Sequence, residues 1–218
     1  MNKRKNKNSK KVLQILEQCY PDAQTELNFK TPFQLLIATM LAAQTTDKQV
    51  NKITKKLFGK YKTPFDFSKL QPEELEQEIK GCGLYKNKSK NIIMASKILV
   101  EKFDGKLPES FEELVSLPGV GRKTANVVLS NAFNKPAFAV DTHVFRVSNR
   151  IGLACAKDVL ETEKQLRKRV PKHQWSKAHH LLIYHGRRVC RARNPKCNEC
   201  KIKAYCNYYT QHFERREE

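Results

Sequence analysis

Apolar residues recur at helical spacing along almost the whole chain. Between residues 47 and 58, for example, Val50, Ile53 and Leu57 fall on one face of a helix with 3.6 residues per turn. Residues 89–103 continue the same pattern. No run of alternating polar and apolar residues bounded by turn signals predicts a strand. The pattern therefore predicts an all-α protein.

One predicted helix is apolar around its whole circumference. It covers residues 33–44, FQLLIATMLAAQ, and such a helix is expected in the centre of a domain. A second helix is predicted over residues 71–81, with Pro72 in its first turn and Gly81 at its end. The longest apolar run, LLIATMLAA, is too short to cross a bilayer, so we expect no membrane association.

The segment 117–125, LPGVGRKTA, predicts a tight hairpin between two helices. Ser110 and Glu113 have the spacing of a capping box for a short first helix, and Pro118 ends that helix. The second helix carries an apolar stripe of Ala125, Val128, Leu129 and Ala132. At about 100° per residue, Lys123 projects roughly opposite this stripe and out of the core.

The glycines of this hairpin suggest a phosphate contact. Gly119 and Gly121 let the backbone approach a ligand, and the amides that open the second helix can receive a phosphate. Two common nucleotide-binding patterns do not fit. The G-x-x-x-x-G-K-[ST] loop requires glycine where Arg122 stands, and the dinucleotide-binding fingerprint requires glycine where Thr124 stands. The alternative is a simple glycine turn between two core helices.

The charge of the chain points to a polyanionic partner. Lys and Arg number 42 against 22 Asp and Glu, which gives a formal net charge of +20. The region from Lys164 to Asn198 contains basic residues and no acidic one. A lysine-rich solvated surface is the alternative, but this segregation favours a binding face, and nucleic acid is the usual partner of such a face.

Four of the seven cysteines lie close together near the end of the chain. Cys190, Cys197, Cys200 and Cys206 follow the pattern C-x6-C-x2-C-x5-C. Disulfides are rare in the cytoplasm, where we expect this protein because no secretory signal follows the basic start, so the pattern predicts a metal centre. The irregular compact spacing favours a cubane iron–sulfur cluster over zinc, which remains the alternative.

The other three cysteines, Cys19, Cys82 and Cys155, are scattered along the chain. We expect them to be ordinary buried thiols. Three histidines upstream of the cysteine loop, His179, His180 and His185, are interpreted as structural residues, because four cysteines already complete one centre.

The hairpin and the cysteine loop together resemble the endonuclease III family of DNA repair glycosylases, in the helix-hairpin-helix superfamily. Further segments resemble the family in the family's order, among them TELNF, PFQLLIATMLAAQTTD, GLYKNKSKNI and AVDTHVFRVSNR. The resemblance implies two helical domains with a DNA groove between them. A six-helix bundle with the helix-hairpin-helix motif would cover residues 27–136. Residues 1–26 and 137–218 would form a discontinuous domain with a [4Fe-4S] cluster in loop 190–206.

The resemblance also implies the activity, that of a bifunctional DNA glycosylase and AP lyase of base excision repair. Such an enzyme removes oxidised pyrimidines from damaged double-stranded DNA and cleaves the strand by β-elimination through a lysine Schiff base. Lys123 matches the family's nucleophile and Asp141 its essential carboxylate. Gln44 matches the side chain that fills the gap left by the extruded nucleotide, and Leu84 matches a wedge in the opposite strand. The local sequence alone favours a helix N-cap at Asp141, a polar helix end at Gln44 and a core residue at Leu84.

Further site residues follow from the resemblance and the motifs. The expected DNA contacts also include Leu117, Gly119, Gly121, Arg122, His143, Arg191 and Arg193, and the expected metal ligands are Cys190, Cys197, Cys200 and Cys206. We expect a monomer that acts in the cytoplasm, associated with the nucleoid.

Three other functions fit the sequence less well. The related adenine-specific glycosylases commonly have an extra C-terminal domain, for which the 12 residues after Cys206 leave no room, and they generally lack a lysine at position 123. A non-catalytic, metal-stapled DNA-binding protein would recognise bends or gaps in DNA, and strand cleavage at an abasic site that depends on Lys123 distinguishes the enzyme from it. A redox carrier that uses the cluster would need neither the basic residues nor the hairpin.

Overall fold

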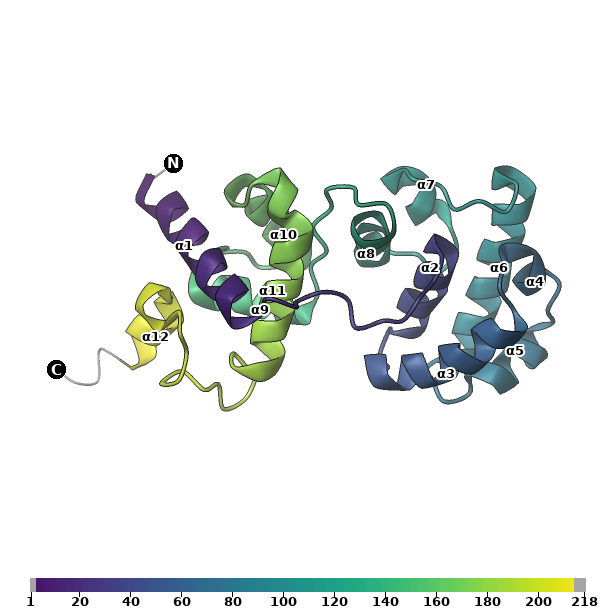
Figure 1. Ribbon diagram of the computed structural model, residues 1–218, viewed down its shortest axis with the longest axis horizontal. Coiled ribbons are helices and arrows are strands. Elements are labelled where there is room, and N and C mark those ends of the chain that lie inside the picture. The colour runs from purple at the N-terminus through teal and green to yellow at the C-terminus, as the bar shows by residue number, and fades with distance from the viewer. Residues whose placement is uncertain (1–2, 214–218) are drawn as a thin grey trace. The chain divides into compact units, whose positions relative to one another are not determined.

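The chain divides into two compact helical units. The computed structural model describes residues 3–213, and all regular structure among them is helical (Figure 1). Residues 26–135 form one unit, here called the central unit. Residues 1–25 and 136–218 form the other, called the terminal unit because it joins the two ends of the chain. These boundaries lie one residue before the predicted ones.

The central unit is built around helix α2. Its helices are α2 (Pro32–Leu41), α3 (Asp47–Lys60), α4 (Pro64–Ser68), α5 (Pro72–Ile79), α6 (Tyr85–Phe103), α7 (Phe111–Ser116) and α8 (Arg122–Ala132). The side chain of Thr31 caps α2, and all residues from Phe33 to Leu41 are buried. Helices α3, α6 and α8 pack against α2. The helix that is apolar on all sides is therefore the centre of its unit, as predicted.

One short helix of the central unit was not visible in the apolar pattern. Helix α4 has only five residues, fewer than two turns, and its start is fixed by a capping box between Thr63 and Asp66. It packs on α6, and its buried Phe67 lies edge-on to Phe33, with ring centroids 5.4 Å apart. With α4 included, the central unit has seven helical segments among the described residues instead of six.

The terminal unit joins the first α-helix of the chain to the last four described α-helices. Its α-helices are α1 (Lys3–Cys19), α9 (Thr142–Ile151), α10 (Val159–Arg169), α11 (Trp175–Arg188) and α12 (Asn207–His212), with short 3₁₀ turns at Lys172–Gln174 and Lys203–Tyr205. Leu16 of α1, Val147 of α9 and Leu181 of α11 belong to one apolar core. The two ends of the chain therefore stabilise each other.

The upstream histidines lie inside the terminal unit. His179 and His185 are both buried. Nδ1 of His179 lies 2.7 Å from the carbonyl oxygen of Ala139, and Nδ1 of His185 lies 3.2 Å from the hydroxyl of Tyr20. These contacts link α11 to other parts of the terminal unit.

The prediction of three buried scattered thiols is correct only for Cys82. Cys19 and Cys155 are exposed. Cys19 is the last residue of α1, and Cys155 lies in the loop before α10, where its amide donates to Gln165. No helix of the part of the chain that the structure describes is long and apolar enough to cross a membrane.

Candidate functional site

The predicted hairpin lies between α7 and α8 of the central unit. Ser110 caps α7, accepting a hydrogen bond from the amide of Glu113. The amide of Val120 then donates to the carbonyl of Leu117 at 3.1 Å, which closes the turn. Gly121 is the N-cap of α8, and no side chain caps this helix start. The backbone amides in the first turn of α8 therefore point out of its N-terminal end, where binding of an anion is favourable.

The two glycines of the hairpin have different roles. Gly119 has φ +76, and a Cβ built there would lie 2.8 Å from Cβ of Asn91 and 2.9 Å from Cε of Met40. Gly121 has φ −89, and a Cβ there would meet nothing within 4 Å. The fold itself requires glycine at position 119. Any requirement for glycine at position 121 has to come from a ligand.

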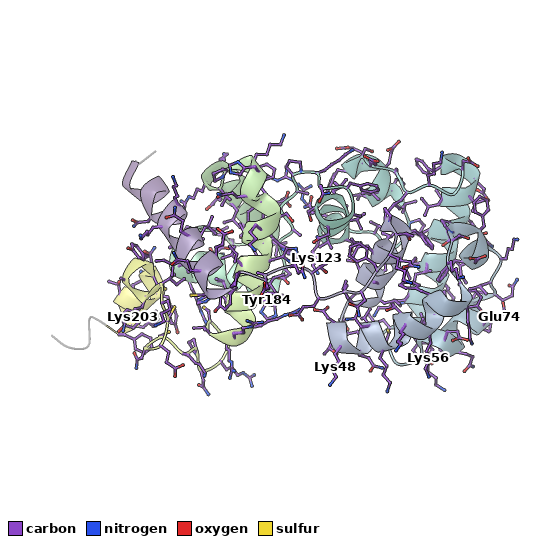
Figure 2. All side chains as sticks on the ribbon, viewed as in Figure 1. Lys48, Lys56, Glu74, Lys123, Tyr184 and Lys203 are labelled. Carbon is purple, nitrogen blue, oxygen red and sulfur yellow. The ribbon has the colours of Figure 1, made fainter. Side chains whose placement is uncertain are left out.

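Lys123 is the second residue of α8, and its side chain is exposed, as its predicted direction requires (Figure 2). Next to it, the guanidinium of Arg122 lies 4.7 Å from the ring centroid of Phe111, so a cation–π contact links α8 to α7. Leu117, another of the expected DNA contacts, is only 2% exposed.

Gln44 and Leu84 occupy two neighbouring turns of the central unit. Both have left-handed backbones, with φ 56 and φ 58, although neither is glycine. The amide of Gly83 donates to Oγ1 of Thr45 at 3.3 Å, so the two turns are in direct contact. Leu84 is 56% exposed, and the local reading of this leucine as a core residue is wrong. An exposed leucine in a conformation that usually favours glycine is a candidate for function.

Asp141 and His143 lie at the start of α9 in the terminal unit. Oδ1 of Asp141 accepts a hydrogen bond of 2.8 Å from the amide of Val144, which makes Asp141 the N-cap. His143 is half-buried, and this burial lowers its pKa, while the carboxylate of Asp141 partly offsets the effect. Nη2 of Arg146 lies 3.1 Å from Nδ1 of His143. Because a guanidinium can only donate, Nδ1 accepts, and the proton of neutral His143 is on Nε2.

The four clustered cysteines line one small cavity of the terminal unit, together with His185 and Arg150. Arg150 holds the loop between the first two cysteines: Nη1 donates to the carbonyl of Arg191 at 2.7 Å, and Nη2 donates to that of Ala192 at 3.1 Å. Its own carbonyl accepts a bond from the thiol of Cys206 at 3.5 Å. Arg150 carries no signal in the sequence, because an arginine inside a helix belongs to no motif. The side chains of Arg191 and Arg193 are exposed.

The chemistry of these thiols suits metal ligands that share a partly buried centre. Burial raises the pKa of Cys200 to about 11, with the neighbouring thiols adding to the effect. Burial likewise raises the pKa of Cys197 and of Cys206. Thiols of this kind become thiolates when a metal replaces the proton. No group of three or more His, Cys, Asp or Glu among the described residues is placed to hold a single metal ion.

Comparisons with known proteins identify the family. Residues 37–172 match the family of HhH-GPD superfamily base excision DNA repair proteins. Endonuclease III of Bacillus subtilis is 53% identical over 188 residues, which cover 86% of this chain and 86% of that protein. Endonuclease III of Rickettsia prowazekii is 49% identical and covers 93% of this chain and 96% of its own. The chain belongs to the endonuclease III family. The predicted family and the assignment to base excision repair as a DNA glycosylase and AP lyase are confirmed.

A solved structure of the endonuclease III family extends the match to the whole fold. It is the structure of a trapped endonuclease III–DNA covalent intermediate, an estranged-adenine complex. It superposes with a TM-score of 0.91 at 46% sequence identity and covers 98% of this chain and 99% of its own. The all-helical architecture of the endonuclease III family is therefore that of this protein, which binds DNA.

The candidate residues of this endonuclease III family member are divided between the two units. Gln44, Leu84 and Lys123 lie in the central unit, and Asp141 lies in the terminal unit with His143 and the four clustered cysteines. The superfamily match over residues 37–172 includes Lys123 and Asp141 but ends before the cysteine loop. The superfamily match therefore covers the hairpin and the start of α9, while the cysteine loop lies outside the matched residues.

Proposed function

We propose that Lys123 is the nucleophile of the glycosylase and lyase reactions. The observation that carries this proposal is the position of Lys123, exposed in the first turn of α8 directly after the glycine hairpin. The relative captured as a covalent DNA intermediate supports it, because such an adduct needs a nucleophilic side chain. A lysine amine is a nucleophile of the required kind.

The proposed reaction begins with extrusion of the damaged nucleotide, since its sugar cannot be attacked within the stacked duplex. The neutral amine of Lys123 attacks C1′ of the sugar, and the base leaves with the electrons of the glycosidic bond. Loss of a proton from nitrogen and opening of the sugar ring give an iminium. Its positive charge makes the C2′ proton acidic, and removal of that proton expels the 3′ phosphate by β-elimination. Asp141 stabilises positive charge on the sugar and assists proton transfer.

The proposed substrates are oxidised pyrimidines in double-stranded DNA. Gln44 fills the gap left by the extruded nucleotide, and Leu84 enters the opposite strand. Both side chains are exposed on turns, so they can reach into a duplex without disturbing the core. The hairpin residues Leu117, Gly119 and Gly121 and the side chains of Arg122, His143, Arg191 and Arg193 contact the DNA. The protein acts as a monomer on the chromosome in the cytoplasm.

The proposed cofactor is a [4Fe-4S] cluster held by Cys190, Cys197, Cys200 and Cys206. The four cysteines line one cavity, and Arg150 fixes the backbone between the first two. When bound, the cluster cross-links the loop through iron–thiolate bonds. The loop would then present Arg191 and Arg193 to the DNA phosphates in a fixed conformation.

Borohydride trapping on a duplex with one abasic site tests the nucleophile. Borohydride reduces the iminium to a stable protein–DNA adduct, and mass spectrometry then locates the modified residue. We expect the adduct on Lys123, and we expect Lys123→Gln to bind the duplex but form no adduct and no nick. Lys102→Gln removes an exposed lysine of α6 and is the control. A Lys123→Gln variant that forms the adduct at the wild-type level would refute the assignment.

A further inference from the structure

Lys88 is a buried lysine of the central unit, with a side chain that is only 7% exposed. Its Nζ donates to the carbonyls of Leu41 at 2.8 Å and Ala43 at 2.6 Å. It also lies 3.2 Å from Oγ1 of Thr45. An ammonium group has three N–H donors, so the protein itself supplies an acceptor for each of them. A buried charge is unfavourable unless it is bonded in this way, which makes Lys88 a candidate for a specific role.

The three acceptors of Lys88 belong to the turn that carries Gln44. The turn follows the last residue of α2, where carbonyl groups lack helical partners and a positive charge is favourable. Gln44 lies between Ala43 and Thr45 and has φ 56. A left-handed backbone is unfavourable for a residue with a Cβ. Lys88 bonds the residues on both sides of Gln44 and thereby holds this unfavourable conformation.

The same lysine also bonds the turn that carries Leu84. The backbone amide of Lys88 donates to the carbonyl of Leu84 at 3.1 Å. The hydroxyl of Thr45 accepts bonds from both Lys88 and the amide of Gly83, at 3.2 Å and 3.3 Å. The two turns touch closely enough that a Cβ on Gly83 would lie 3.3 Å from the carbonyl oxygen of Gln44. Lys88 and Thr45 therefore connect two exposed left-handed residues into one structural element.

We propose that Lys88 is a positioning residue for damage recognition, which holds the turns of Gln44 and Leu84 so that both side chains enter the duplex together. This inference rests on the proposed roles of Gln44 and Leu84. Lys88 itself is buried and acts only through the two turns. Because the turns are fixed before DNA binds, ordering them costs little at the moment of recognition.

The test compares binding to a duplex that contains a tetrahydrofuran abasic analogue with binding to the intact duplex. Lys88→Met removes the three bonds, and Lys90→Met removes one exposed positive charge from the same helix as a matched control. Hydrogen bonds to charged groups contribute about 1.5–3 kcal/mol, so we expect Lys88→Met to reduce the preference for the abasic duplex about tenfold or more. Affinity for the intact duplex should match that of Lys90→Met within about twofold.

A mutant cycle with the double variant Gln44→Ala/Leu84→Ala separates positioning from general stability. If Lys88 acts through the two turns, Lys88→Met should change the preference less than about twofold in the background that lacks both side chains. Additive effects, or equal losses on both duplexes, would overturn the proposal. If Lys88→Met does not fold, Thr45→Val removes the shared hydroxyl with little change in shape and should reduce the preference by about threefold. An unchanged preference in Thr45→Val would then overturn it.

The outcome also distinguishes this inference from the proposed function. A wild-type protein that binds both duplexes equally, or a Gln44→Ala variant that keeps the full preference, contradicts the assigned role of Gln44. A Lys88→Met variant with an intact preference, measured where Gln44→Ala loses it, contradicts the role of Lys88 alone.

Discussion

Asp141 caps helix α9, with its Oδ1 2.8 Å from the amide nitrogen of Val144. The residue matched to the essential carboxylate of the family therefore also holds the first turn of a helix. An N-cap fixes the direction of the side chain, because one carboxylate oxygen is bonded to the first turn of the helix. The helical role and the proposed catalytic role are compatible, and they can be separated by substitution.

Asp141→Ser should separate them because serine is a good N-cap but carries no carboxylate. We expect a loss of unfolding free energy below about 1 kcal/mol, with single-turnover cleavage of an abasic duplex slowed about 100-fold or more. Asp141→Ala should lose the cleavage and also about 0.5–2 kcal/mol of stability. Urea midpoints and cleavage rates measure the two effects. Wild-type cleavage by Asp141→Ser would show that Asp141 is only a cap.

The two hairpin glycines should respond differently to alanine. Gly119→Ala places a Cβ at φ +76 and within 3 Å of Asn91 and Met40, so we expect a stability loss of about 1–3 kcal/mol. Gly121→Ala meets open space and should cost less than about 1 kcal/mol. Its affinity for any DNA duplex should nevertheless fall, since the new methyl group obstructs the backbone approach. Unchanged DNA binding by a stable Gly121→Ala protein would rule out that approach.

The metal content of the purified protein tests the cofactor. With iron supplied under anaerobic conditions, we expect a yellow-brown protein with absorbance near roughly 400 nm and about four irons per chain. Cys197→Ser should lose the colour and most of the soluble protein, because the loop has no other centre. Cys19→Ser, which changes an exposed thiol outside the loop, should retain both. A colourless protein with one zinc per chain would contradict the cluster.

His180 should make the protein less stable in mild acid. Burial lowers its pKa from 6.5 to about 3, and His179 and Lys177 add to the shift. Below pH 6.5 the unfolded chain binds a proton that folded His180 does not bind, so its contribution to stability is present above pH 6.5 and lost as the pH falls toward 3. Between pH 7 and 5.5 this amounts to about 1 kcal/mol.

Urea denaturation at pH 7 and pH 5.5 measures that contribution. A His180→Gln variant should show a pH dependence smaller than wild type by about that 1 kcal/mol. His173→Gln, which replaces an exposed histidine of the same unit, should keep the wild-type difference. Identical pH dependence of His180→Gln and wild type would mean that His180 does not stay neutral in the folded protein.

The sequence predicts those features that depend on periodicity and on local motifs. Helix α2 is apolar on every side, and it is buried on nearly every side because a helix without a polar face is most stable inside the protein. The hairpin and the cysteine loop are local in sequence, so their residues are recognised without knowledge of the fold. Helix α4 was missed because five residues are too few to show a period.

Features that depend on contacts between distant residues could not be predicted. Gln44 and Leu84 have left-handed backbones although neither is a glycine, so no sequence signal marks these conformations. The turn of Gln44 is held by Lys88, which lies 44 positions later in the chain. A lysine in a basic sequence is expected on the surface, so its burial carries no sequence signal. Arg150 is similar, since only the fold brings it to the carbonyls of Arg191 and Ala192.

The discontinuity of the terminal unit sets an order of events during synthesis. The central unit is a single stretch of chain, so it can fold as soon as residue 135 has left the ribosome. Leu16 of α1 is made early but packs in one core with Leu181 of α11, so the apolar face of α1 has to wait for its partner. The four clustered cysteines are translated later still. Loading of the proposed cluster would therefore be the last step of maturation, and a ribosome stalled before residue 190 would leave a folded central unit without the cysteine loop.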